Sequence, residues 1–496
     1  MTTEPYHLLT PLRSPSLSST LFWVEANDVV ILRAKPATNK VRSPADPLSM
    51  TRTLAVVMRL TLCSLAVLLT IGLVVGPAVA QPKEVFIPLL VYRTGPYSPS
   101  GIPVANGLAD YYTLINERDG GINGVRLTWE ECETQYNTQR SVECYERLKG
   151  RGAVAVLPFS TAVMYQLIPI TATDKISIIT VGAGMTAAAA GRWFPWVFAF
   201  PTTYWNQASA VIRYIGQREG GQEKLRGKKI VHIFLNNLYG KEANPILETL
   251  ARQFGYQLTL LPVNPPGETQ QATWLRVRRL SPDWIFLSGW GVMNQVAIKE
   301  AVAANYPMDH LVGNWWSASE SYVIPAGPGA KGYIGAAFHA PGADFQVHRD
   351  IFKFVYDRGK GAGNREAVGE VLYNRGIVSA MYEVEAIRGA MAKYGNRPIT
   401  GEQMRWGLEH LNLTDQRLEE LGMKGFTHSL KVTCEDHEGA GPVMFQQWDG
   451  HRWSTISGWI PVMRDVVGPK LEAAAAEEGR KLGAAMRDCS KEQEPR

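Results

Sequence analysis

The segment from Ala153 to Thr186 constrains the fold of this chain more than any other stretch. It begins with an apolar run, passes through a Pro-Phe-Ser-Thr turn and an amphipathic segment, and ends with a second apolar run, Ile176–Val181, and a loop of small residues. This order predicts a βαβ unit of a parallel sheet. The loops that follow its two strands should meet at one edge of the sheet, where open α/β sheets bind ligands.

Two hydroxyl side chains mark the start of the predicted helix in this unit. Ser160 and Thr161 follow the first apolar run almost directly. At a helix N-terminus, backbone N–H groups and side-chain hydroxyls can hold an anionic or polar group. Taken by themselves, the two hydroxyls are better explained as helix caps, and only the surrounding sequence favours a binding role.

Strand and helix patterns alternate along two long parts of the chain. Pro201-Thr202-Thr203 interrupts the first series, and a second candidate crossing between domains lies at 333–341. We therefore predict an α/β protein with two lobes, each a parallel sheet flanked by helices. The expected strands are 85–91, 126–130, 153–157, 176–181 and 196–200, then 230–235, 258–263, 284–287 and 310–312, with short antiparallel strands at 431–433, 443–448 and 453–456. The main expected helices are 105–116, 242–254, 295–304, 345–356, 372–394, 401–409 and 471–486.

The N-terminal part of the chain carries signals for export. Residues 1–49 are rich in Pro, Ser and Thr, which indicates a disordered leader or an incorrectly assigned start. Residues 50–80 combine early arginines, an apolar run and Ala78-Val79-Ala80, the pattern of a secretory signal peptide. A membrane anchor is the alternative, since the run is nearly long enough to span a bilayer. The Ala-x-Ala site favours cleavage, which would leave a periplasmic chain that starts at Gln81.

Export places the remaining cysteines in an oxidising compartment. Cys132 and Cys144 are close in sequence and form a plausible disulfide. Closing so short a loop could add roughly 3 kcal/mol in the entropic model. The alternative is a pair of buried free thiols. The sequence leaves the state of Cys434 and Cys489 open.

Composition and motifs argue against several function classes. The net charge of +5 is small for 496 residues, and no long block of Lys and Arg suggests nucleic acid as a partner. The sequence contains no G-x-S-x-G, H-E-x-x-H or C-x-x-C motif. We therefore expect no enzyme activity, no cofactor and no metal site.

Several motifs occur in a specific order and spacing. They are TGPYSPSG (94–101), INERDGGINGVRL (115–127), PFST (158–161), VFAFPTTYWNQA (197–208), NNLYGKEA (236–243) and SGWGVMNQVAIKEA (288–301). Together they resemble the type I periplasmic solute-binding proteins of ABC importers, in the leucine/isoleucine/valine-binding branch. The resemblance covers essentially Lys83 to Ile460.

The resemblance implies two lobes joined by three crossing strands, with a small ligand buried between them as they close. The implied lobes are 81–200 with 340–428, and 201–339 with 429–467, followed by a helical polar tail, 468–496. The implied partners are the permease and ATPase subunits of an importer, with membrane contact only through the permease and the protein itself a monomer. A sensory ligand-binding domain is an alternative. Such domains normally continue into a membrane helix, and the polar tail favours a free binding protein.

The resemblance also assigns candidate ligand-binding residues. The family's serine that holds the ligand carboxylate matches Ser160 or Thr161, and its next loop matches Gly182 to Gly184. The family commonly has a threonine near the end of this loop, which here keeps only backbone donors. Tyr239 retains the tyrosine of the second lobe's Tyr-Gly motif, and Trp290 stands where a side chain packs on the ligand.

One position departs from the family pattern. The acidic residue that pairs with the ligand ammonium should fall near Trp315, and Glu320 lies five residues further on. A buried ammonium without a carboxylate is costly, so the site is poorly matched to a zwitterionic amino acid. The surrounding aromatic residues favour an aromatic or apolar organic acid or amide. A branched-chain or other amino acid remains the alternative ligand.

Three more residues are candidates for the cleft. Tyr373 belongs to the aromatic set, and Arg93 and Arg375 could pair with a ligand carboxylate through their planar guanidinium groups. For each arginine, an ordinary surface position is the simpler interpretation.

We predict that export removes the chain through Ala80, because the three parts of a signal peptide occur there in order. N-terminal sequencing of the exported protein should give Gln81 as the first residue. A mature protein that keeps the apolar segment would contradict this.

Overall fold

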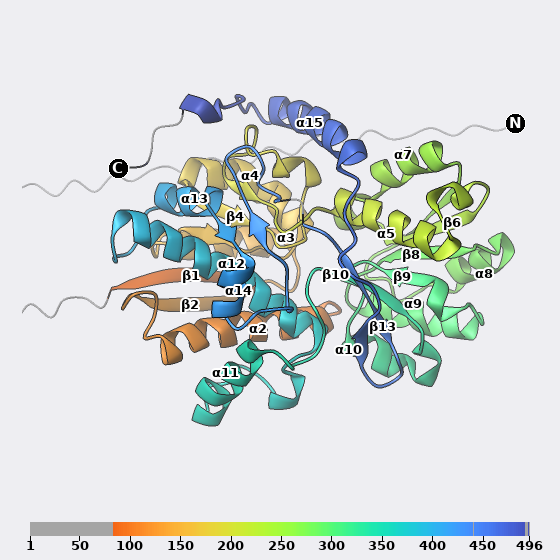
Figure 1. Ribbon diagram of the computed structural model, residues 1–496, viewed down its shortest axis with the longest axis horizontal. Coiled ribbons are helices and arrows are strands. Elements are labelled where there is room, and N and C mark those ends of the chain that lie inside the picture. The colour runs from red at the N-terminus through yellow and green to blue at the C-terminus, as the bar shows by residue number, and fades with distance from the viewer. Residues whose placement is uncertain (1–82, 440, 492–494, 496) are drawn as a thin grey trace, which may run out of the picture. The chain divides into compact units, whose positions relative to one another are not determined.

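The computed structural model describes residues 83–439, 441–491 and 495. The expected leader, 1–49, and signal peptide, 50–80, lie outside the described residues. Within the described part, the strands form two groups, which Figure 1 shows at the left and at the right. We call the part built on the N-terminal group the first lobe and the part built on the other the second lobe.

The first lobe is built on two parallel sheets. Its strands are β1 (Glu84–Val91), β2 (Arg126–Glu133), β3 (Ala155–Val156), β4 (Ser177–Ile179) and β5 (Val197–Phe198). β1 pairs with β2, β4 lies between β3 and β5, and a bridge between Leu89 and Leu157 places β3 beside β1. All residues of β1 after Glu84 are buried, which is typical of a parallel strand covered on both faces.

Helices from two separate stretches of the chain cover these sheets. They are α2 (Ser98–Arg118), α3 (Thr138–Lys149), α4 (Thr161–Asp174), α11 (Gln346–Phe354), α12 (Val371–Tyr394), α13 (Gly401–Glu409) and α14 (Asp415–Glu420), with a hairpin of β11 (Asn412–Leu413) and β12 (Leu430–Lys431). α2 and α12 approach closely at glycines. A Cβ on Gly107 would lie 2.1 Å from the carbonyl oxygen of Tyr373, so the helices could not pack this way with a larger residue there.

The second lobe contains a seven-stranded sheet in the order β14-β13-β10-β9-β8-β6-β7. Its strands are β6 (Lys229–Leu235), β7 (Gln257–Val263), β8 (Trp284–Ser288), β9 (Leu311–Gly313), β10 (Ile334–Ala337), β13 (Met444–Trp448) and β14 (Trp453–Thr455). The helices are α5 (Tyr204–Glu219), α6 (Leu238–Lys241), α7 (Asn244–Phe254), α8 (Gln271–Leu280), α9 (Val292–Ala303) and α10 (Glu320–Val323). Only β13 and β14 are antiparallel to their neighbours. The predicted α/β class with parallel sheets is confirmed.

Several helices differ from the sequence prediction: α8 was not predicted, and the C-terminal helix spans Arg464–Lys481 rather than 471–486. Two further differences concern α2 and α5. α2 begins at Ser98 rather than 105, because Pro99 occupies the first turn, where a missing N–H costs nothing. α5 begins directly after Thr203, where only a break in the pattern was expected. Nearly the whole first half of α5 is buried, so its sequence shows no amphipathic period.

Three stretches cross between the lobes and hydrogen-bond to one another. The backbone N–H of Ala199 donates to the carbonyl of His437 at 2.9 Å, and the N–H of Gly441 donates to Pro201 at 2.6 Å. The hydroxyl of Thr427 donates to the carbonyl of Phe338 at 3.0 Å. Because each crossing is paired with another, the lobes can move only if these segments bend together.

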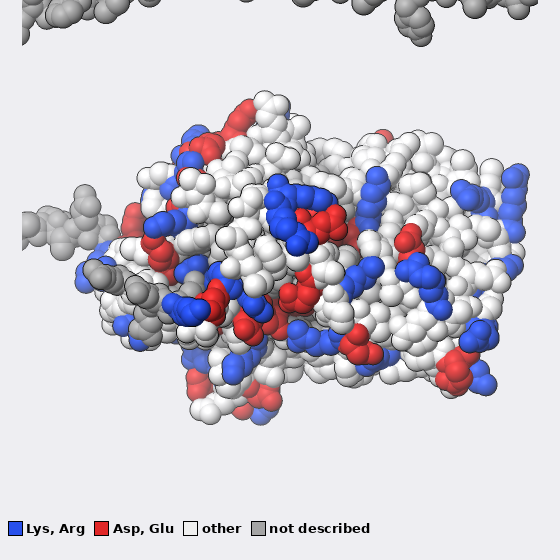
Figure 2. All heavy atoms as spheres, turned by 90° about the horizontal axis from the view of Figure 1, so that it is seen from above, with Lys and Arg blue, Asp and Glu red and all other residues white. Residues whose placement is uncertain are grey.

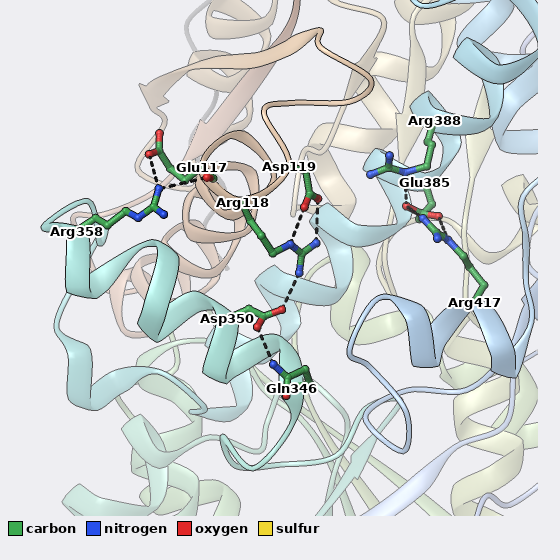
Figure 3. A network of polar contacts seen from close by, with 9 residues as sticks. All are labelled: Glu117, Arg118, Asp119, Gln346, Asp350, Arg358, Glu385, Arg388 and Arg417. Carbon is green, nitrogen blue, oxygen red and sulfur yellow. Dashed lines mark hydrogen bonds and ion pairs between the residues drawn. The ribbon is translucent and has the colours of Figure 1, made fainter.

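Ion pairs join the two chain stretches that make up the first lobe (Figure 3). Arg118 at the end of α2 contacts Asp119 at 2.7 Å and Asp350 on α11 at 2.8 Å. Glu117 on α2 contacts Arg358, which follows α11, at 3.5 Å. The helices that follow the second crossing are therefore attached to the first lobe by charge as well as by packing.

Charged side chains of both signs are interspersed on the face shown in Figure 2. This distribution agrees with the small net charge of +5. It lacks the single-sign stripe that nucleic-acid-binding surfaces show.

The C-terminal helix α15 (Arg464–Lys481) runs along the top of the view in Figure 1. Just before it, the N–H of Met463 donates to the hydroxyl of Ser209 on α5 at 2.9 Å. Its far end packs Gly479 against the ring of Trp193 in the first lobe. The helix is therefore attached to both lobes.

Two disulfides are present. Cys132 on β2 is joined to Cys144 on α3, the pair favoured by the sequence. Cys434 is joined to Cys489, which the sequence had left open because the two lie 55 residues apart. The second disulfide attaches the chain beyond α15 to the segment near the third crossing.

We predict that replacing both Cys434 and Cys489 by Ser exposes α15 to proteolysis. Only Val467, Leu471, Ala475 and Gly479 of this helix are buried, so packing alone holds it weakly. Limited trypsin digestion should cut first at Arg480 or Lys481.

The matched control replaces Cys132 and Cys144 by Ser. It should lower the melting temperature, since the closed loop is worth roughly 3 kcal/mol, and leave cleavage in α15 unchanged. Equal cleavage of α15 in both double variants would contradict the assigned role.

Candidate ligand-binding site

Loops that follow the parallel strands of both lobes enclose a small cavity of about 10 Å³. Its walls are predominantly aromatic. The lining residues are Tyr136, Phe159, Thr161 and Ala183 from the first lobe and Tyr204, Tyr239, Trp290 and Trp316 from the second. A space of this size holds about one water molecule, so the side chains themselves fill the interior in this conformation.

The two predicted hydroxyls lie at the start of α4 and are both buried. The Ser160 hydroxyl caps the helix by accepting the N–H of Val163 at 3.5 Å. The Thr161 hydroxyl accepts the N–H of Gly184 at 3.3 Å and lines the cavity. Ser160 is thus a helix cap, whereas Thr161 connects the loops that follow β3 and β4.

The loop of small residues requires glycine at its last position. Gly184 has φ +92°, and a Cβ there would lie 1.9 Å from the sulfur of Met164. A threonine would therefore clash and adopt a strained backbone. The N–H groups of Gly182 and Gly184 are already used within the protein, since they donate to the carbonyl of Phe200 at 3.2 Å and to the hydroxyl of Thr161 at 3.3 Å.

Adjacent tryptophans from the second lobe bind the same carbonyl of the first. The indole N–H groups of Trp315 and Trp316 donate to the carbonyl oxygen of Gly182 at 2.6 and 2.7 Å. Both rings are buried. Trp315 therefore connects the two lobes by a hydrogen bond.

Tyr239 and Trp290 both line the cavity. The Tyr239 hydroxyl donates to the carbonyl of Gly289 at 2.8 Å and also contacts Asn314. Burial raises the pKa of Tyr239 well above its usual value, so it stays a neutral donor. The indole nitrogen of Trp290 has no hydrogen-bond partner among the described residues.

Two of the predicted cleft residues lie elsewhere. The Arg93 guanidinium is committed to Glu131 at 2.6 Å and to Asn106 at 2.8 Å. The Tyr373 hydroxyl donates to Asp110 at 2.7 Å. Neither lines the cavity, because each reaches a carboxylate of its own lobe. We therefore leave Arg93 and Tyr373 out of the proposed site.

Arg375 is fully buried on α12. Its guanidinium lies with its centre 4.8 Å from the ring of Trp316 and 4.0 Å from that of Phe338. It therefore lies directly behind one wall of the cavity, within the same aromatic cluster.

No acidic side chain lines the cavity. Glu320, the alternative partner for a ligand ammonium, instead accepts the N–H of Val371 at the start of α12, at 2.9 Å. Burial raises the pKa of its carboxyl to about 7. Glu320 is thus a helix cap, and the lining offers no carboxylate to a cation.

Sequence reasoning missed three aromatic members of the lining. Tyr136 follows β2, Phe159 follows β3 and Tyr204 begins α5. The rule that ligands bind at the carboxyl ends of parallel strands would have identified Tyr136 and Phe159. Tyr204 gave no such signal, since it follows a crossing rather than a strand.

A carboxylate from the second lobe binds the first lobe beside the cavity. The two Glu242 carboxylate oxygens accept the Tyr165 hydroxyl at 2.8 Å and the Thr186 N–H at 3.1 Å. Burial raises the pKa of Glu242. The hydrogen bonds donated by Tyr165 and Thr186 act in the opposite direction, because they stabilise the ionised carboxylate.

Comparisons with known proteins agree with this architecture. The family model for periplasmic binding proteins matches residues 84–452. A solved structure from the Pseudomonas fluorescens group, described as an ABC transporter permease, is 41% identical, covers 82% of this chain and 100% of its own, and has a TM-score of 0.77. The search of curated protein sequences found no significant match.

Two more distant structures share the fold. A branched chain amino acid ABC transporter from Thermus thermophilus with bound valine is 20% identical, covers 77% of this chain and 98% of its own, and has a TM-score of 0.67. A solute binding protein from R. palustris in complex with benzoate is 15% identical, covers 77% of this chain and 97% of its own, and has a TM-score of 0.59. None of the helices in the described part of this chain combines the length and apolar composition of a membrane span.

We predict that Tyr165→Phe loosens the closed contact around Glu242. Loss of this hydrogen bond, worth about 1 kcal/mol, should speed hydrogen exchange of the Thr186 amide about fivefold. Tyr145→Phe is the matched control, since it removes a tyrosine–carboxylate bond to Asp174 inside the first lobe. If the two variants change Thr186 exchange equally, Glu242 does not hold the lobes together.

Proposed function

The chain belongs to the periplasmic binding protein family, and we propose that it captures a small solute for an ABC importer outside the cytoplasm. The solute binds between the lobes, and the closed complex delivers it to the permease, whose ATPase subunits drive transport. The paired crossings and the contact of Glu242 with the opposite lobe support opening and closing about a hinge. We propose binding without turnover, and a single chain as the working unit.

The ligand we propose is an organic acid or amide with an aromatic or apolar body. The observation that carries this is a cavity walled by aromatic rings and hydroxyls, with no carboxylate in its lining. The Thr161 hydroxyl, which lines the cavity, supplies a polar contact to the ligand. Burial of an apolar body gains ~25 cal/mol per Å² of its surface.

A zwitterionic amino acid fits this site less well. Its ammonium would be buried against the indole of Trp315 or Trp290, where a cation–π contact returns ~2 kcal/mol. This is less than the several kcal/mol that an unpaired buried ion costs. The shared fold leaves the choice open, because it binds valine in one structural neighbour and benzoate in another.

We predict that mature protein binds aromatic acids and amides at least about tenfold more tightly than leucine or valine, a difference of ~1.4 kcal/mol. Calorimetric titration with benzoate, phenylacetate, their amides and the two amino acids measures this directly. Tighter binding of leucine that Glu320→Gln abolishes would contradict the proposed ligand class and would give Glu320 the role of ammonium partner.

A further inference from the structure

Arg375 is the buried cation of the aromatic cluster between the lobes. Its Nε–H donates to the Nε2 of His339 at 3.0 Å. Its two terminal nitrogens, Nη1 and Nη2, are buried and have no hydrogen-bond partner among the described residues. A guanidinium offers five N–H donors, so most of the hydrogen-bonding capacity of this side chain is unused.

The charge of Arg375 also has no counter-ion among the described residues. The ion pairs of the described residues include none with Arg375. Burial and the neighbouring guanidinium hold the pKa of His339 well below its usual value, so this acceptor is neutral. Burial lowers the pKa of Arg375 to about 9, which leaves it protonated at neutral pH. A buried, protonated guanidinium costs free energy as long as no anion binds beside it.

Trp316 lies between this guanidinium and the cavity. Its ring packs over Arg375 at 4.8 Å, it lines the cavity, and its N–H donates to Gly182. The indole therefore places a flat apolar group against the guanidinium and a polar group against the opposite lobe.

We propose that Arg375 binds the carboxylate of the ligand and that Trp316 is a displaceable cover over it. When a ligand enters, the indole leaves Gly182 and the guanidinium, the ligand carboxylate accepts N–H groups from Nη1 and Nη2, and the apolar body of the ligand takes the place of the indole. This inference rests on the proposed function, since it requires a small ligand between the lobes.

The geometry favours a monocarboxylate over other anions. The two unpaired nitrogens form the planar fork that a carboxylate matches with two parallel hydrogen bonds. One guanidinium balances one negative charge, whereas a phosphate group with nearly two charges would need further cations. The ring of Phe338 beside the fork, and the space that the Trp316 ring leaves, suit an attached apolar body.

The test compares acids with their neutral amides in matched variants. Benzoate, phenylacetate and hexanoate, and the amide of each, are titrated into mature wild-type protein, Arg375→Met, Arg93→Met and Trp316→Ala. Arg375→Met should weaken acid binding at least about 30-fold, because it removes one member of a buried charge pair, and should leave amide binding unchanged. Arg93→Met is the control, since Arg93 pairs with Glu131 away from the cavity, and it should bind acids as wild type does.

Trp316→Ala tests the cover independently of whether Arg375→Met folds. It should bind acids roughly tenfold more tightly, because the ligand no longer displaces the ring from its hydrogen bond and stack. In wild type, acids should change the tryptophan fluorescence, and Trp316→Phe should abolish most of this change.

The outcomes separate this inference from the proposed function. Equal acid binding by wild type and Arg375→Met would overturn the role of Arg375 and leave the solute-binding function intact. Weaker acid binding by Trp316→Ala would overturn the role of the cover. Failure of wild type and Trp316→Ala to bind any acid or amide, with leucine or valine binding instead, would overturn the proposed ligand class and this inference with it.

Discussion

The closed arrangement of the two lobes depends on one carbonyl group. The oxygen of Gly182 accepts indole N–H groups from two consecutive residues of the opposite lobe. Gly182 has φ +66°, and a Cβ would lie 2.5 Å from the ring of Phe338, so only glycine allows the approach. Glu242 reinforces the same closure from beside the cavity.

Most of the fold could be predicted from the sequence because parallel strands are locally encoded. Runs such as 284–287 are continuously apolar, and the turns and helices between them have their own signals. α5 could not be found in this way, since its first half is buried on all sides and has no polar face. The Cys434–Cys489 disulfide was equally out of reach, because the fold rather than the sequence spacing brings the two residues together.

The candidate site was predictable in position and only partly in composition. Strand ends identify the loops that carry Thr161, Tyr239 and Trp290, and all three line the cavity. The sequence could not tell which of the two arginines lies near the cavity, since each is a single cation among polar and apolar residues. The structure distinguishes them by their partners: within the part of the chain that it describes, Arg93 has a carboxylate partner and Arg375 has none.

The pair of tryptophans also explains how Trp316 could move away at a small cost in free energy. Removing the only donor of a buried carbonyl would leave that group unsatisfied, a penalty of about 1–3 kcal/mol. Gly182 has two donors, so it stays satisfied by Trp315 when Trp316 leaves. Trp315 is the better fixed of the two, since it packs against Tyr204 and Phe338 and does not line the cavity. The apparent association constant for a ligand then equals the intrinsic constant multiplied by the fraction of molecules in which Trp316 is displaced. The equilibrium between the covered and uncovered positions of Trp316 therefore helps to set the affinity. It favours ligands that fill the space of the indole ring and also supply the anion that the ring cannot offer to Arg375.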